Sequence, residues 1–94
     1  MLDVRLYSSF KRDYKRAIAQ GMDPARLKEV VDLLREEKPL PSTFRDHKLR
    51  NDHKYKNMRE CHIQPDWLLI YRIEHDELIL YLARTGTHSE LFKK

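Results

Sequence analysis

The chain has 94 residues, enough for one domain (residues 1–94) with a single modest core. Hydrophobic residues make up 40% and charged residues 36%, a balance that indicates a globular protein and excludes disorder. One cysteine, Cys61, excludes an internal disulfide and suits a reducing compartment. No segment is apolar enough to cross a membrane and the first residues lack a signal-peptide pattern, so we expect a cytoplasmic protein.

The net charge of +4 arises within residues 45–59, because the rest of the chain has 13 basic and 13 acidic residues. A basic segment that also holds histidines is typical of a surface that binds a polyanion. A solvated, lysine-rich loop explains the charge equally well. The basic residues of this segment are Arg45, Lys48, Arg50, Lys54, Lys56 and Arg59.

The first half of the chain predicts a short strand followed by two helices. Residues 3–7 alternate between polar and apolar and indicate the strand. Residues 10–18 then carry an apolar stripe at helical spacing, which Gly21 ends. Asp23 as N-cap and Pro24 at the first helical position begin a second helix, which ends near Glu37. Residues 38–57 contain two prolines and predict a long loop of functional importance or high mobility.

The second half predicts three strands, at residues 57–63, 67–73 and 78–84. The middle one is nearly all apolar and should be central in the sheet. The order β-α-α-β-β-β predicts an α+β fold, with a helical hairpin packed on one face of an antiparallel sheet. The last two strands are apolar on both faces, so the second face is either open to a partner or covered by Leu91, Phe92 and the long loop.

Histidines are the strongest candidates for chemistry in this sequence. Side chains alternate along a strand, so Glu60 and His62 should share one face while Cys61 points to the other. That separation argues against a Cys–His nucleophile pair and predicts that Cys61 is a core residue. His62 and Asp66 flank a turn that His47 or His88 could join, but no tight ligand spacing indicates a metal, and we expect no cofactor.

Acid–base cleavage of RNA fits this composition better. One histidine can remove the proton of a 2′-hydroxyl while another protonates the departing 5′-oxygen near neutral pH. An arginine can stabilise the charge on phosphorus, and aromatic rings can stack on bases. An ordinary surface role remains the alternative for any single histidine.

Three stretches resemble the YafQ family of bacterial toxins, within the RelE/ParE superfamily of type II toxin–antitoxin systems. They are FRDHKL (44–49), RECHIQPDWLLIYR (59–72) and RTGTHSELF (84–92). Their order and spacing agree with the family over essentially the whole chain. The resemblance implies an endoribonuclease, an mRNA interferase that cuts mRNA in the ribosomal A site by metal-independent acid–base catalysis and so inhibits translation.

The resemblance also implies roles for particular residues. Glu60 stands where an acidic residue is common in the family, and we rank it below the others. The loop after His47 departs from the family's usual His-Pro-Leu and glycine-containing turn, which leaves the position of His47 open. Which histidine is acid and which is base also stays open. The implied catalytic residues are His47, His62, Asp66 and His88, and the expected substrate-binding residues are Arg84, Trp67, Phe92, Arg59, Lys54 and Lys56.

The partners implied by the resemblance are the ribosome, mRNA and a cognate antitoxin, of ribbon-helix-helix type with an acidic, flexible tail. Operator DNA would be reached only through the antitoxin, and no membrane is implied. Two alternatives remain. A ParE-like toxin acting on DNA gyrase shares the fold without needing the histidines, and an inactive module would bind RNA or antitoxin without cutting.

Overall fold

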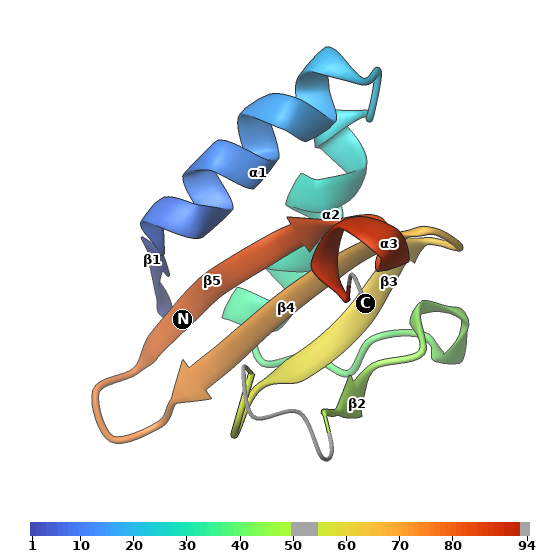
Figure 1. Ribbon diagram of the computed structural model, residues 1–94. Coiled ribbons are helices and arrows are strands. Elements are labelled where there is room, and N and C mark those ends of the chain that lie inside the picture. Colours follow the sequence, from blue (N-terminus) through green and yellow to red (C-terminus); the bar gives the residue numbers. More distant parts are fainter. Residues whose placement is uncertain (50–54, 93–94) are drawn as a thin grey trace.

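The structure of the chain is a computed structural model that describes residues 1–49 and 55–92. Five strands form one sheet in the order β1-β5-β4-β3-β2, with two long helices on one side and a short helix on the other (Figure 1). The elements are β1 (Asp3–Leu6), α1 (Ser8–Ala19), α2 (Pro24–Arg35), the 3-10 turn η1 (Ser42–Phe44), β2 (His47–Lys48), β3 (Arg59–Gln64), β4 (Trp67–Glu74), β5 (Ile79–Gly86) and α3 (His88–Leu91).

The predicted α+β class and helical hairpin are confirmed, but the sheet is mixed. β3, β4 and β5 are antiparallel, whereas β1 runs parallel to β5 at the sheet edge. Two long helices and three further strands separate β1 from β5 in the chain, so no tight hairpin forces these two strands to be antiparallel. The expected long loop also contains η1 and the two residues of β2, which pair antiparallel with β3.

Local signals account for the helix ends. The Asp23 side chain accepts a hydrogen bond from the Ala25 amide and Pro24 occupies the first turn of α2, as predicted. Thr87 caps α3 in a capping box with Glu90. No helix in residues 1–49 or 55–92 combines the length and apolar character needed to span a bilayer.

Apolar clusters lie on both faces of the sheet. The larger one packs α1 and α2 against β4 and β5, and includes Phe10, Leu27 and Leu69. On the second face the chain covers itself, because Leu91 of α3 and Tyr55 pack over the fully buried Leu68 and Ile70. This agrees with one of the two alternatives for that face, coverage by the chain end. The expectation that β4 is central is confirmed by the order of the strands.

Candidate active site

The candidate site lies on the second face of the sheet, opposite α1 and α2. Alternation along β3 is as predicted. Cys61 belongs to the helix-side core, where burial raises the pKa of its thiol. Glu60 and His62 point to the other face, and the pairing of β2 with β3 places His47 directly beside Glu60.

Glu60 lies at the centre of this site. Its Oε1 atom is 3.5 Å from Nε2 of His47 and 3.5 Å from Nε2 of His62. Glu60 and His62 are 5% and 8% exposed, whereas the His47 side chain is half exposed. A buried carboxylate between two imidazoles can stabilise a protonated imidazole or accept its proton. When either imidazole is protonated, its contact with the Glu60 carboxylate becomes an ion pair.

Backbone carbonyls set the orientation of two of these rings. Nδ1 of His47 lies 2.7 Å from the Arg45 carbonyl, and Nδ1 of His62 lies 3.2 Å from the Pro65 carbonyl. A carbonyl only accepts, so in both rings the proton is on Nδ1. Both Nε2 atoms are therefore the ones directed at Glu60.

Asp66 orients His88 in a similar way. Its Oδ1 accepts from the backbone N–H of His88 and from Nδ1 of the same residue, both at 3.0 Å. The hydrogen bond from the His88 backbone N–H is the main reason that the pKa of Asp66 lies below its usual value. The hydrogen bond from the His88 ring is the second reason. No residue of the described ranges bonds to Nε2 of His88, and the His88 ring centroid is 5.4 Å from that of His62.

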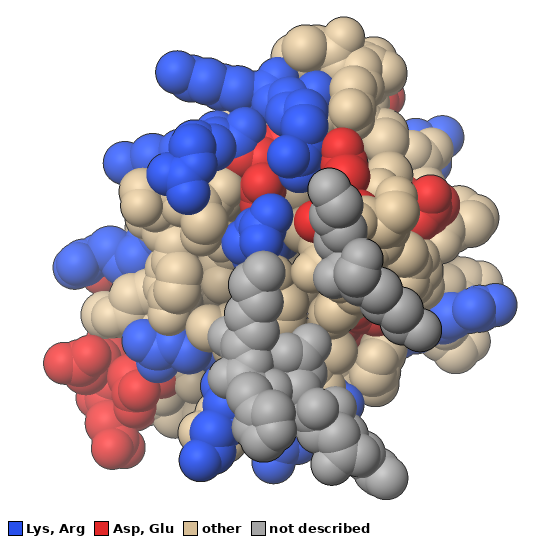
Figure 2. Space-filling view, in the orientation of Figure 1, with Lys and Arg blue, Asp and Glu red and all other residues tan. Residues whose placement is uncertain are grey.

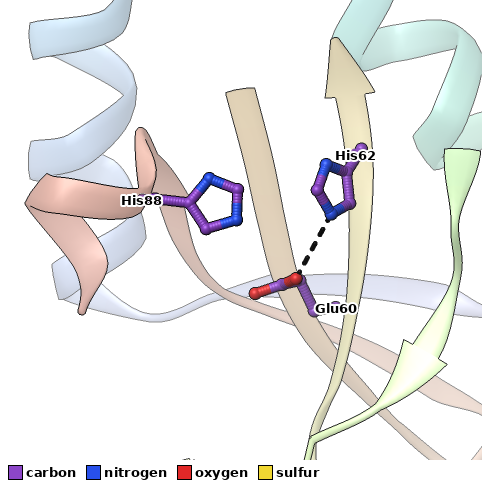
Figure 3. Close-up of side chains that lie close together, drawn as sticks. All are labelled: Glu60, His62 and His88. Carbon is purple, nitrogen blue, oxygen red and sulfur yellow. Dashed lines mark ion pairs between the residues drawn. The ribbon is translucent and has the colours of Figure 1, made fainter. Parts of the chain in front are cut away.

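Glu60, His62 and His88 converge on one point although they come from β3 and α3 (Figure 3). One ligand atom from each lies within 4.8 Å of the other two. Two imidazole nitrogens and a carboxylate oxygen are donors that Zn²⁺ or Cu²⁺ accepts, so these residues could hold a metal ion. Sequence spacing did not indicate this set, because only the sheet and the last turn bring 60, 62 and 88 together.

The turn into α3 is fixed by close contacts. Thr87 N–H donates to Glu90 Oε1 at 2.9 Å, and Glu90 N–H donates to Thr87 Oγ1 at 3.2 Å. A Cβ atom on Gly86 would lie 2.8 Å from Glu90 Oε1, so only glycine lets this box close without a shift. Glu90 also pairs with Arg16 of α1 at 3.0 Å, which connects the His88 turn to the helical hairpin.

Arg84, expected to bind phosphate, is held by a residue that the sequence reasoning missed. Its Nε and Nη2 atoms donate to the two carboxylate oxygens of Asp13 at 2.5 and 3.2 Å, and Nη1 donates to the Tyr55 hydroxyl at 2.9 Å. Asp13 is 4% exposed and also accepts from the Thr85 amide at 3.1 Å. A signal was available, because Asp13 interrupts the apolar stripe of α1.

The other expected substrate residues lie in different environments. Trp67 is fully buried and its indole N–H donates to Thr85 Oγ1 at 2.8 Å, so its ring contacts protein on all sides. Phe92 is half-buried and lies beside the site, 6.4 Å from the His88 ring. Arg59 is paired with Asp46 at 3.1 Å, and Lys56 is exposed. Lys54 falls outside the described residues.

Positive charge on the surface is not confined to the segment at 45–59. Figure 2 shows basic side chains gathered over α1, in the same orientation as Figure 1. This helix contributes Lys11, Arg12, Lys15 and Arg16, and its one acidic residue, Asp13, is buried. A polyanion approaching the molecule therefore meets a second basic surface beside α3.

Comparison with known proteins supports one family. The family model described as "Bacterial toxin of type II toxin-antitoxin system, YafQ" matches residues 2–93. The chain is 35% identical over 91 residues to the mRNA interferase toxin YafQ of Escherichia coli K12, covering 96% of this chain and 95% of that protein.

Solved structures agree with this match. A metal-bound toxin from Helicobacter pylori is 41% identical and gives a TM-score of 0.91, with 98% of this chain and 100% of that one covered. The toxin chain of the E. coli DinJ–YafQ complex is 35% identical and gives 0.84, with 98% and 99% covered.

Proposed function

This chain belongs to the YafQ family of bacterial toxins of type II toxin–antitoxin systems, and from that premise we propose that it is an mRNA interferase that cuts messenger RNA during translation. The observation that carries this proposal is the convergence of His62 and His88 on the buried Glu60. Relatives of this chain bear the name mRNA interferase, and the convergent groups suit proton transfer.

The proposed reaction is an internal transfer of the phosphoryl group. The 2′-hydroxyl loses its proton and its oxygen attacks the adjacent phosphorus, while the 5′-oxygen leaves and takes up a proton. The products are a 2′,3′-cyclic phosphate and a 5′-hydroxyl end. The Glu60–His62 pair and His88 share the two proton transfers, since both are within reach of one point.

Asp66 and Glu60 act through the histidines. Asp66 fixes the tautomer and angle of His88, whereas Glu60 forms an ion pair with His62 or His47 when that imidazole is protonated. The exposed Arg45 precedes His47 and supplies positive charge beside the site. Nε and Nη2 of Arg84 each donate to Asp13, and Nη1 donates to Tyr55, so we assign this arginine to holding the site together as well as to phosphate binding.

We place the reaction in the ribosomal A site and in the cytoplasm. His47, Asp66 and His88 are exposed, so the site is open on one side. Correct orientation of the reacting groups alone contributes a large part of the lowering of an activation barrier. The cleavage rate of an open site therefore gains most from an external surface that positions the RNA. The antitoxin partner rests on the DinJ–YafQ complex of a 35% identical relative. We propose a ribbon-helix-helix antitoxin whose acidic tail meets the basic surface of α1.

Primer-extension mapping of a reporter mRNA after brief induction tests this function. Wild type should produce cuts within translated codons that vanish when the start codon is removed and in His88→Ala. The matched control is His75→Ala, since His75 is 73% exposed in the β4–β5 hairpin, far along the sheet from the site. Growth arrest with intact mRNA would contradict the proposal, and a supercoiling assay would then test gyrase.

Antitoxin binding has a separate test. A mobility-shift assay with the operon's promoter DNA should show no complex with the toxin alone and a complex when the antitoxin is added. A shift by the purified toxin alone would contradict the statement that operator DNA is reached only through the antitoxin.

A further inference from the structure

A cavity of about 320 Å³ adjoins the candidate site, and the part of the chain that the structure describes contributes none of the expected substrate-binding residues to its walls. It lies between η1, the end of β3 and the start of α2. Its walls include Phe44, Arg45, Gln64, Arg26 and His62. Its volume is at the lower end of the range for small-ligand sites, roughly 300–1,000 Å³, which suits one nucleotide rather than a longer ligand.

The cavity walls carry the three kinds of group that recognise a nucleotide. Phe44 is half-buried against the helix-side core, so its ring is held in place where it lines the cavity. Gln64 offers an amide donor and acceptor, which can pair with a base edge. Arg45 and Arg26 are exposed, and neither side chain is ion-paired within residues 1–49 and 55–92. Guanidinium groups without a carboxylate partner bind phosphate.

A neighbouring cavity gives an internal contrast. It shares Arg26 and Phe44 with the first, but its walls include Asp23 and Glu29. Two carboxylates repel a phosphate, whereas none of the described residues that line the first cavity carries a carboxylate. The cavity beside His62 is therefore the one whose charge suits RNA.

His62 connects the cavity to the reacting groups. Nδ1 of His62 bonds to the Pro65 carbonyl, and Pro65 lines the cavity. Nε2 of the same ring faces Glu60. The His62 imidazole thus lies between the cavity and Glu60. A nucleotide in the cavity is therefore a direct neighbour of the scissile phosphate.

We propose that this cavity is a nucleotide subsite of the RNA substrate, in which Phe44 stacks on one base next to the cut and Gln64 sets the preference for that base. The proposal rests on the function proposed above. Phe44 supplies sequence-tolerant stacking, Gln64 supplies discrimination, and Arg45 with Arg26 supplies phosphate binding that is the same for every base.

Binding is tested without cleavage. The amide resonances of the labelled protein are followed by NMR during titration with each of the four ribonucleoside 5′-monophosphates and with inorganic phosphate. We expect saturable shifts at Phe44, Arg45 and Gln64 for nucleotides, differing among the four bases. Phe44→Leu, which keeps an apolar side chain, should weaken binding at least about fivefold. Absent shifts here, or equal shifts with inorganic phosphate, would overturn the proposal.

Charge-matched variants separate base recognition from attraction. Arg45→Gln should weaken binding of all four nucleotides by a similar factor, while Gln64→Ala should reduce the difference among them. Arg5→Gln removes an exposed arginine from β1, outside both basic surfaces, and should leave both measurements unchanged. An Arg5→Gln effect as large as that of Arg45→Gln would show general electrostatics and overturn the subsite.

The cleavage map distinguishes failure of the subsite from failure of the function. In wild type, cuts should favour certain bases on one side of the cleaved bond, and Gln64→Ala should lose this preference. If wild type cuts and both Gln64→Ala and Phe44→Leu keep the wild-type preference, the subsite is wrong and the nuclease function stands. If nucleotides bind as described but wild type leaves mRNA intact, the function is wrong and the cavity remains a nucleotide site.

Discussion

The two faces of the sheet are built from the same strands but bury different chemistry. Two twelve-residue helices cover the first face, and the cluster beneath them is dominated by apolar residues. A four-residue helix and Tyr55 cover the second face, where Glu60 and His62 are buried beside a smaller apolar cluster. The first face therefore supplies most of the hydrophobic stabilisation, while the second keeps polar groups in place for chemistry.

The sharpest test of this difference is Glu60→Gln, because glutamine keeps the shape and removes the charge. We expect cleavage to fall by roughly 10²–10⁴-fold, since Glu60 contacts both His47 and His62. The thermal midpoint should change little. Cleavage of the reporter mRNA and a melting curve measure the two quantities, and a variant that cuts at the wild-type rate would remove Glu60 from the site.

Truncation of one leucine on each face compares their contributions to stability. Leu69 is fully buried in the helix-side cluster, and Leu69→Ala should lower the free energy of unfolding by about 2–5 kcal/mol. Leu91→Ala, in α3, should cost less stability and more activity, because it loosens the turn that holds His88. Urea unfolding gives the two free energies. Equal losses would contradict the proposed division between the faces.

Asp13 connects the faces, so its loss should affect both. Asp13→Asn leaves the Arg84 guanidinium without its buried counter-charge and should cost roughly 2–4 kcal/mol of stability. Arg84→Gln in the same background should cost less than it does alone, which a double-mutant cycle measures. Strict additivity of the two substitutions would show that the ion pair contributes nothing specific.

The smallest expected effect is the pH response of the His88 turn. The folded-state pKa of Asp66 is lowered by its bonds to His88, so this contribution is present above the unfolded-state pKa and lost as pH falls through the folded-state pKa. The His88 amide resonance should therefore shift in that acid range. Asp66→Asn should abolish this shift, and an unchanged acid response in the variant would assign it to another group.

Much of the fold was predictable from local patterns. The Asp23-Pro24 pair marked the start of α2, and alternation placed Cys61 and His62 on opposite faces. β2 was missed because two residues carry no periodic signal. The parallel direction of β1 was missed because it depends on pairing with a strand more than 70 residues away.

The candidate site was predictable in its residue types and only partly in its arrangement. His47, His62, Asp66 and His88 were named from motifs, and the structure brings these four into one region. Trp67 shows the limit of the approach, because its motif suggested RNA binding while its environment is the core. Motifs record which residues recur, but solvent exposure follows from contacts with the rest of the chain.

The sequence by itself determined the helices, the central strand, the face of each β3 side chain and the family, because these depend on local spacing and residue type. Only the tertiary structure decided that Glu60 lies between His47 and His62, that Asp13 holds Arg84, and that a cavity beside His62 holds two arginines that no described residue pairs with. These features join residues that are distant in the chain, and such distances are set only when the sheet and helices pack together.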